Sequence, residues 1–107
     1  GKIHAVLARA WQSRIKGRDL YDYVFYLSRD SAVNLPHLRE RLIDSGYIHG
    51  GDPCSLNDVK RMLCEHFDTM DFSQAKQDVR PFIHDASALD VWSADFFKQI
   101  TENLKQR

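Results

Sequence analysis

The sequence lacks several features that would assign a function class at once. It has only two cysteines, Cys54 and Cys64. Because Cys64 lies inside a helical pattern, we expect ordinary reduced thiols and no disulfide. No apolar run approaches the roughly 20 residues that a membrane-spanning helix needs, and the start of the chain has no secretory signal. These absences favour a soluble, cytoplasmic chain that does not bind membranes.

The chain also lacks net charge, because 15 basic residues balance 15 acidic ones. A net charge of zero argues against a general polyanion binder. The charges are nevertheless unevenly distributed. Residues 1–51 carry eight bases and five acids, whereas residues 52–102 carry five bases and ten acids. We therefore expect an anionic ligand to prefer the first half of the chain.

Apolar residues recur with the period of an α-helix along most of the chain. A first helix is expected from residue 2 to about residue 15, ending at Gly17. Asp19 is expected to begin a second helix, either as its cap or by favouring its positive end. The remaining helices are expected from Asn34 to Gly46, from Ser55 through Phe67, from Asp71 to Pro81, and from Ser93 through Leu104.

No segment alternates with period two over a useful length, and residues 81–92 have an irregular pattern. The expected fold is therefore all-α, a small bundle of five or six short helices. The first residue is glycine, and the helical pattern starts at once without room for a cap. We expect residues 1–107 to form a single helical domain, a fragment of a longer protein.

The main functional signal is the order of charges near the start of the chain. Residues 1–18 contain five bases and no acid, and Asp19 and Asp22 then open a segment rich in aromatic residues. At ~100° per residue, both aspartates lie on one margin of the second helix. A hairpin through Lys16-Gly-Arg18 would bring them to the basic margin of the first helix. The five bases are Lys2, Arg9, Arg14, Lys16 and Arg18.

Such a groove would suit a metal–nucleotide site, because lysine neutralises phosphate and a carboxylate holds Mg²⁺ or accepts a hydroxyl proton. A structural alternative stays open on spacing alone. Arg18 and Asp22 stand at i, i+4 and can form a surface ion pair, while Asp19 serves as an N-cap.

The motif Lys2-x-His4-Ala5, followed by Lys16-Gly-Arg-Asp-Leu-Tyr-Asp22, resembles the later two motifs of the AbiEii-type nucleotidyltransferase toxins. These toxins are the enzymatic half of type IV toxin–antitoxin and abortive-infection systems. The rest of the chain, including Tyr26-Leu-Ser-Arg29, resembles the helical C-terminal portion of the same proteins. The resemblance implies the C-terminal part of a larger α/β enzyme.

That enzyme would use Mg²⁺ and a nucleoside triphosphate to modify a target, with tRNA the substrate class of some relatives and a cognate antitoxin as partner. By the same resemblance, Lys2 contacts the triphosphate, Asp19 is the acidic catalytic residue and Asp22 supports it. The predicted phosphate-binding set is Lys2, Arg9, Lys16 and Arg18.

The sequence departs from the family pattern in one respect. The Gly-rich triphosphate loop and the Asp-x-Asp metal pair of the N-terminal sheet domain are not in it, and Gly50-Gly-Asp52 does not qualify because it lies between expected helices. The full-length protein is therefore expected to be a nucleotidyltransferase. This fragment alone is expected to be inactive and to hold no metal or cofactor.

Other chemistries have little support in the sequence. The five histidines never pair at i, i+4, Cys64-Glu-His66 lacks the partners of a zinc site, and no serine lies in a nucleophile motif. Tyr23 and Trp11 are expected to be core residues and not base-stacking ones. The alternative function is a non-catalytic helical module whose basic first hairpin binds RNA or an acidic partner.

Overall fold

The computed structural model describes residues 3–7, 16–29 and 32–107. Within these ranges the chain is largely helical, which confirms the expected small all-α bundle. No helix in them is long and apolar enough to cross a membrane. Residues 3–7 are helical, and the elements that follow are α2 (Gly17–Ser28), β1 (Ala32–Val33), α3 (Leu35–Asp44), α4 (Leu56–Phe67), α5 (Phe72–Val79), two 3₁₀ helices (Arg80–Phe82 and Ala86–Leu89), α6 (Ala94–Thr101) and β2 (Lys105–Gln106).

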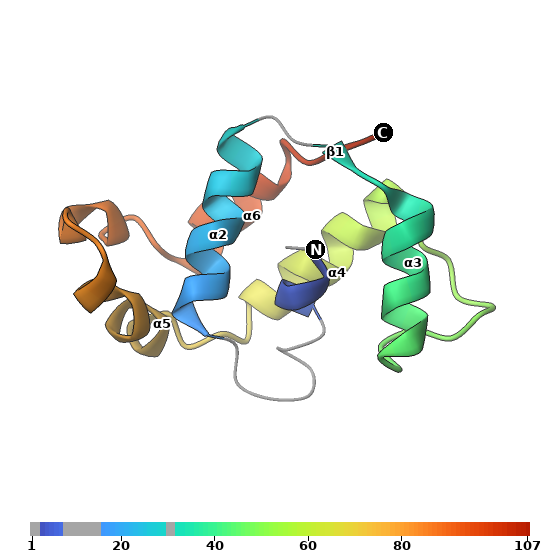
Figure 1. Ribbon diagram of the computed structural model, residues 1–107, viewed down its shortest axis with the longest axis horizontal. Helices are drawn as coiled ribbons and strands as arrows, with labels where there is room; N and C mark the ends of the chain where they lie inside the picture. Colours follow the sequence, from blue (N-terminus) through green and yellow to red (C-terminus); the bar gives the residue numbers. More distant parts are fainter. Residues whose placement is uncertain (1–2, 8–15, 30–31) are drawn as a thin grey trace.

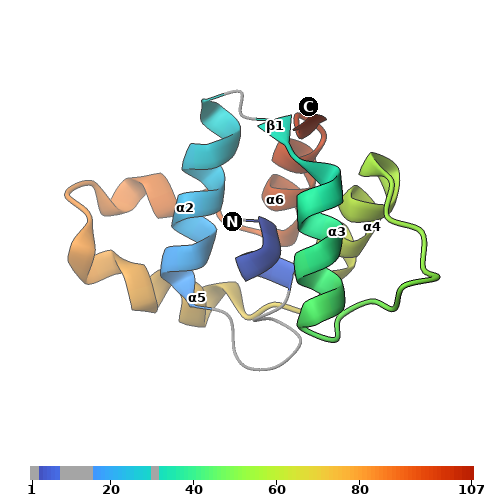
Figure 2. The ribbon, with the colours of Figure 1, turned by 45° about the vertical axis from the view of Figure 1, so that its right-hand side comes forward.

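Helix α2 is central to the arrangement. It packs against α5 and α6, and α4 packs against α6. The helical residues 3–7 lie between α2 and α3, as the two views agree (Figure 1, Figure 2). Their apolar side chains Ile3, Val6 and Leu7 are buried in the shared core. The start of the described chain is therefore part of the bundle.

Local capping signals fix the starts of four helices where the sequence predicts them. Each cap side chain accepts a hydrogen bond from a backbone N–H of the first turn, a group that has no partner inside the helix. Ser55 and Asp58 form a reciprocal capping box at the start of α4. The other three caps are Asn34 before α3, Asp71 before α5 and Ser93 before α6.

The expected start of α2 is wrong by two residues. The helix begins at Gly17, so Gly17 and Arg18 belong to its first turn and not to a hairpin turn. Asp19 lies in that first turn, where it favours the positive helix end but does not cap it. The capping acceptor comes from another helix, because Asp78 Oδ2 of α5 accepts a hydrogen bond from Gly17 N at 3.2 Å.

Three other expectations need correction. Strands β1 and β2 form a two-residue parallel pair, with Val33 opposite Gln106, which is too short to leave an alternating pattern. Helix α6 ends at Thr101, and Leu104 is buried beyond it. Residues 81–92, expected to be irregular, contain one whole 3₁₀ helix, Ala86–Leu89, and the end of another, Arg80–Phe82.

Tyr23 is a core residue, as expected, whereas Trp11 lies outside the described residues. The Tyr23 ring is fully buried, with Phe67 and Phe97 as aromatic neighbours at centroid distances of 5.7 and 6.3 Å. Its hydroxyl lies 2.7 Å from Thr101 Oγ1. Burial raises the pKa of Tyr23, so the phenol stays protonated. Because Thr101 donates its only proton to the Phe97 carbonyl, Tyr23 is the donor between α2 and α6.

Replacing Tyr23 with Phe should lower the free energy of unfolding by about 1 kcal/mol. The change removes one buried hydrogen bond between α2 and α6, but Thr101 keeps its own acceptor on Phe97. Urea denaturation followed by circular dichroism measures the loss. Tyr21→Phe is the matched control because Tyr21 is only partly buried, and it should change stability by less than about 0.5 kcal/mol. Equal effects of the two changes would contradict the assignment.

Candidate functional site

The structure describes four of the predicted site residues. Lys16, Arg18, Asp19 and Asp22 all lie at the start of α2, where the two bases are exposed and the two carboxylates are half-buried. Lys2 and Arg9 lie outside the described residues. The expected convergence of the margins of the first two helices therefore stays a prediction.

Three of these residues meet at one cavity between α2 and α5. This α2–α5 pocket has a volume of about 580 Å³, within the range of small-molecule sites in proteins. Helices α2 and α5 lie side by side around it (Figure 1, Figure 2). Asp19 is on the same helical turn but does not line the pocket. The lining residues are Lys16, Arg18, Tyr21, Asp22, Asp78, Val79, Phe82 and Ile83.

The lining residues that come from α5 and the segment after it were not predicted as site residues. Phe82 follows Pro81 in the first 3₁₀ helix and is 83% exposed, an unusual exposure for so large an apolar ring. Together with Tyr21 it gives the pocket two aromatic surfaces beside two bases. No periodic or motif signal marks the lining residues at and after the end of α5, because they reach α2 only through tertiary packing.

Asp78 has a structural role in the pocket. Its Oδ2 accepts from Gly17 N at 3.2 Å, and its Oδ1 accepts from Gln74 Nε2 at 3.2 Å. Both carboxylate oxygens are therefore used to hold the start of α2 against α5. Asp78 positions the residues that follow Gly17 and is poorly placed to donate to a metal.

Gly17 fixes how closely the two helices approach. An ideal Cβ on Gly17 would lie 2.0 Å from the backbone carbonyl oxygen of Ala75 in α5. No L side chain fits at that distance, so glycine is required for this contact. The contact places Lys16 and Arg18, the two neighbours of Gly17, at the rim of the pocket.

The pocket residues suit only part of a Mg²⁺ site. Mg²⁺ in nucleotide sites is held by one or two carboxylates together with substrate phosphates. Two carboxylates line the pocket, those of Asp22 and Asp78, and Asp78 already holds the start of α2. Within the described ranges, no group of three or more His, Cys, Asp or Glu side chains is placed to hold a metal ion. The described residues therefore do not form a complete metal site.

One part of the structural alternative is wrong, because Asp19 lies in the first turn of α2 and is not its N-cap. The other part, an ion pair between Arg18 and Asp22, stays a prediction. Ion pairs elsewhere in the described chain join Arg61 to Asp58 and Glu65, and Lys98 to Asp68.

Other reactive side chains are accounted for by the fold. Cys54 and Cys64 are free, as expected, and burial raises the pKa of both thiols. His66 Nε2 lies 2.7 Å from the Tyr47 hydroxyl, and burial lowers the pKa of this histidine. His66 thus joins α4 to the segment after α3.

A helical bundle that presents two exposed bases at the rim of a pocket, beside the carboxylates of Asp22 and Asp78, belongs to the class of helical domains suited to phosphate-bearing ligands. Comparison with known families makes this specific. The chain belongs to the AbiEii family, described as nucleotidyl transferase AbiEii toxin, type IV TA system, whose model matches residues 1–100. No curated protein and no solved structure matches the chain.

The family match confirms the resemblance that the opening motifs carry, and it includes both motifs. It is a family of nucleotidyltransferase toxins of type IV toxin–antitoxin systems. Membership therefore implies an antitoxin partner and the use of a nucleoside triphosphate with a metal ion. It does not by itself assign a role to any single residue of the α2–α5 pocket.

Proposed function

We propose that this chain is the helical domain of a nucleotidyltransferase toxin and that the start of α2 forms part of its active site. The observation that carries the proposal is the meeting of Lys16, Arg18 and Asp22 at one cavity of about 580 Å³. Two exposed cations can neutralise phosphate charge there, and Tyr21 and Phe82 offer ring faces to a base.

In the proposed reaction, a hydroxyl oxygen of the acceptor attacks the α-phosphorus of the nucleoside triphosphate. The bond from that phosphorus to the bridging oxygen breaks, and pyrophosphate leaves. The hydroxyl proton passes to a carboxylate, a role that we assign to Asp19. Lys2, Lys16 and Arg18 hold phosphate oxygens, with Arg9 as a further contact.

Mg²⁺, when bound, would supply positive charge that stabilises the phosphate groups. Asp22 is the residue of the pocket that would help to hold it. The remaining carboxylates for the metal would come from a sheet domain outside residues 1–107, so the helical domain alone would be inactive. We propose tRNA as the acceptor, the cytoplasm as the location, and an antitoxin encoded nearby as the partner.

The paired change Lys16→Gln and Arg18→Gln tests this assignment in the full-length toxin. Loss of two phosphate contacts should raise the KM for the nucleoside triphosphate about tenfold or more. Transfer of an α-labelled nucleotide to RNA, in the presence of Mg²⁺, measures it. Arg61→Gln is the control, because Arg61 is exposed on α4, outside the pocket, and pairs only with Asp58 and Glu65 among the described residues.

An unchanged KM in the double variant, with the fold intact by circular dichroism, would remove Lys16 and Arg18 from the site. The same assay separates the proposal from a non-catalytic module. Such a module would bind RNA with strong salt dependence but transfer none of the four nucleotides.

A further inference from the structure

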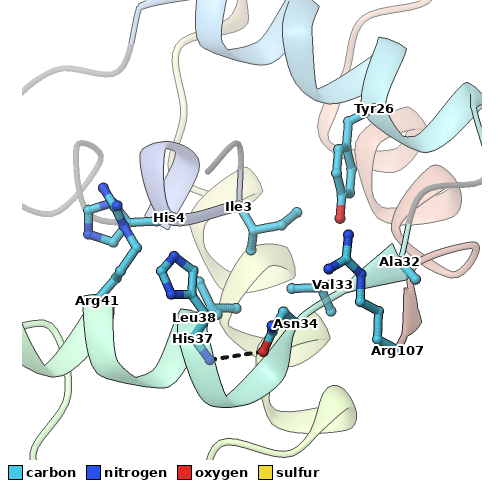
Figure 3. A pocket seen from close by; sticks show the side chains of 10 residues that line it. All are labelled: Ile3, His4, Tyr26, Ala32, Val33, Asn34, His37, Leu38, Arg41 and Arg107. Atoms are coloured by element: carbon cyan, nitrogen blue, oxygen red, sulfur yellow. Dashed lines mark hydrogen bonds between the residues drawn. The ribbon is translucent and has the colours of Figure 1, made fainter.

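A second cavity lies on the other side of α2, lined by four segments far apart in sequence. It has a volume of about 240 Å³ and shares no lining residue with the α2–α5 pocket. We call it the α3 pocket, because α3 supplies much of its wall (Figure 3). Its polar lining side chains are His4, Tyr26, Asn34, His37, Arg41 and Arg107.

The α3 pocket has a one-sided charge. Arg41 and Arg107 are permanently cationic, and His4 and His37 carry imidazoles that donate hydrogen bonds. No Asp or Glu is among the described residues that line it. This contrasts with the α2–α5 pocket, where Asp22 and Asp78 offset Lys16 and Arg18.

The basic groups lie at two ends of the cavity. Figure 3 shows the Arg107 guanidinium below the Tyr26 hydroxyl at one end, and His4 beside Arg41 at the other end, with His37 between them. Arg41 and Arg107 are exposed, so their guanidinium groups can reach a ligand without breaking the core. An anion at either end would meet a guanidinium group together with a neutral hydrogen-bond donor.

The fold holds this arrangement in place. Arg107 N donates to the Val33 carbonyl at 3.0 Å, which extends the β1–β2 pairing by one step. The Asn34 side chain accepts from His37 N at 3.1 Å and fixes the first turn of α3. The short parallel pair, whose Val33 is a core residue, thereby also brings Arg107 to α3.

We propose that the α3 pocket binds a phosphate group at a site separate from the α2–α5 pocket. Guanidinium groups match phosphate oxygens with two parallel hydrogen bonds, and arginine is favoured wherever such recognition is needed. The volume of about 240 Å³ lies below the usual range for drug-sized ligands. The ligand is therefore a compact anion, either free phosphate or pyrophosphate, or one phosphate of a nucleic-acid backbone.

Amide chemical shifts provide the test. The protein is titrated separately with inorganic phosphate, with pyrophosphate and with a single-stranded uridine octamer at fixed ionic strength. Saturable shifts at the amides of Asn34, His37 and Arg41 are expected. Saturation by phosphate or pyrophosphate identifies a free anion as the ligand, and saturation by the octamer alone identifies a backbone phosphate. Absence of shifts with all three ligands overturns the proposal.

Matched variants show whether the arginines carry the binding. Arg41→Gln with Arg107→Gln should weaken it about tenfold or more, whereas Arg61→Gln should change it less than about twofold. Equal affinity in the double variant overturns the proposal. If the double variant does not fold, Arg107→Gln alone, a change at an exposed residue, gives the same test with a smaller effect.

Anion binding at the α3 pocket can be tested separately from nucleotidyl transfer at the α2–α5 pocket. Lys16→Gln with Arg18→Gln leaves the α3 pocket unchanged, because neither residue lines it. Amide shifts at α3 should therefore persist in that variant. Their loss there would show that the ligand binds at the α2–α5 pocket instead.

Discussion

Asp19→Asn should abolish nucleotidyl transfer by the full-length toxin, lowering kcat by about 10²- to 10⁴-fold, the usual contribution of general acid–base catalysis. The change keeps the size of the side chain but removes the carboxylate that we assign as proton acceptor. Asp19 does not cap α2, since Asp78 supplies that acceptor, so the helix should still form. Incorporation of an α-labelled nucleotide into RNA measures the loss, and circular dichroism confirms the fold.

Three further variants show whether the loss of transfer is specific to the carboxylate of Asp19. Lys2→Ala should also abolish transfer, by the triphosphate contact that the family resemblance implies. Asp22→Asn should reduce transfer less than Asp19→Asn, because we assign Asp22 only a supporting role. Asp44→Asn, a change at an exposed carboxylate at the end of α3, should have no effect. Full activity of Asp19→Asn together with inactive Asp22→Asn would reverse the two assignments.

Gly17→Ala should lower the free energy of unfolding by about 3 kcal/mol or more, at the upper end of overpacking effects. Alanine favours a helix over glycine by only about 1 kcal/mol. The added Cβ would lie 2.0 Å from the Ala75 carbonyl oxygen, a backbone atom that cannot rotate away. Helices α2 and α5 must therefore separate, which also breaks the Gly17–Asp78 hydrogen bond. Urea denaturation measures the change.

Gly50→Ala and Gly51→Ala are the matched controls for Gly17→Ala. A Cβ at either position has no atom within 4 Å, and neither backbone has a positive φ. These changes should be neutral or stabilise the protein by up to about 1 kcal/mol, because alanine restricts the unfolded chain. Comparable destabilisation at all three glycines would show that the helix contact at Gly17 is not the cause.

The local structure of this chain could be predicted well from sequence because its signals lie within a few residues of one another. The Ser55–Asp58 capping box and the Asn34 cap are formed by side chains three residues from the amides that they bind. Val59, Leu63 and Phe67 likewise recur at the spacing of one helical face, and all three are buried. Each of these features depends on helical geometry alone.

The cap of α2 could not be predicted from local sequence signals. Its capping carboxylate is Asp78, 61 residues further along the chain, so no local pattern records it. The same separation explains why Asp78 and Phe82 were not predicted as neighbours of Lys16 and Arg18. Strands of two residues, such as β1 and β2, are also invisible to periodicity, because they form only when the C-terminal segment reaches residue 33.

By itself, the sequence determined the all-α class, most helix starts, and the bases and carboxylates at residues 2–22 that mark the AbiEii family. Helical periods, caps and motifs are all written in neighbouring residues. Only the tertiary structure decided which of those residues share a cavity, and that Arg41 and Arg107 line another. Such contacts depend on how closely whole helices approach, and at Gly17 that approach depends on a backbone atom of Ala75.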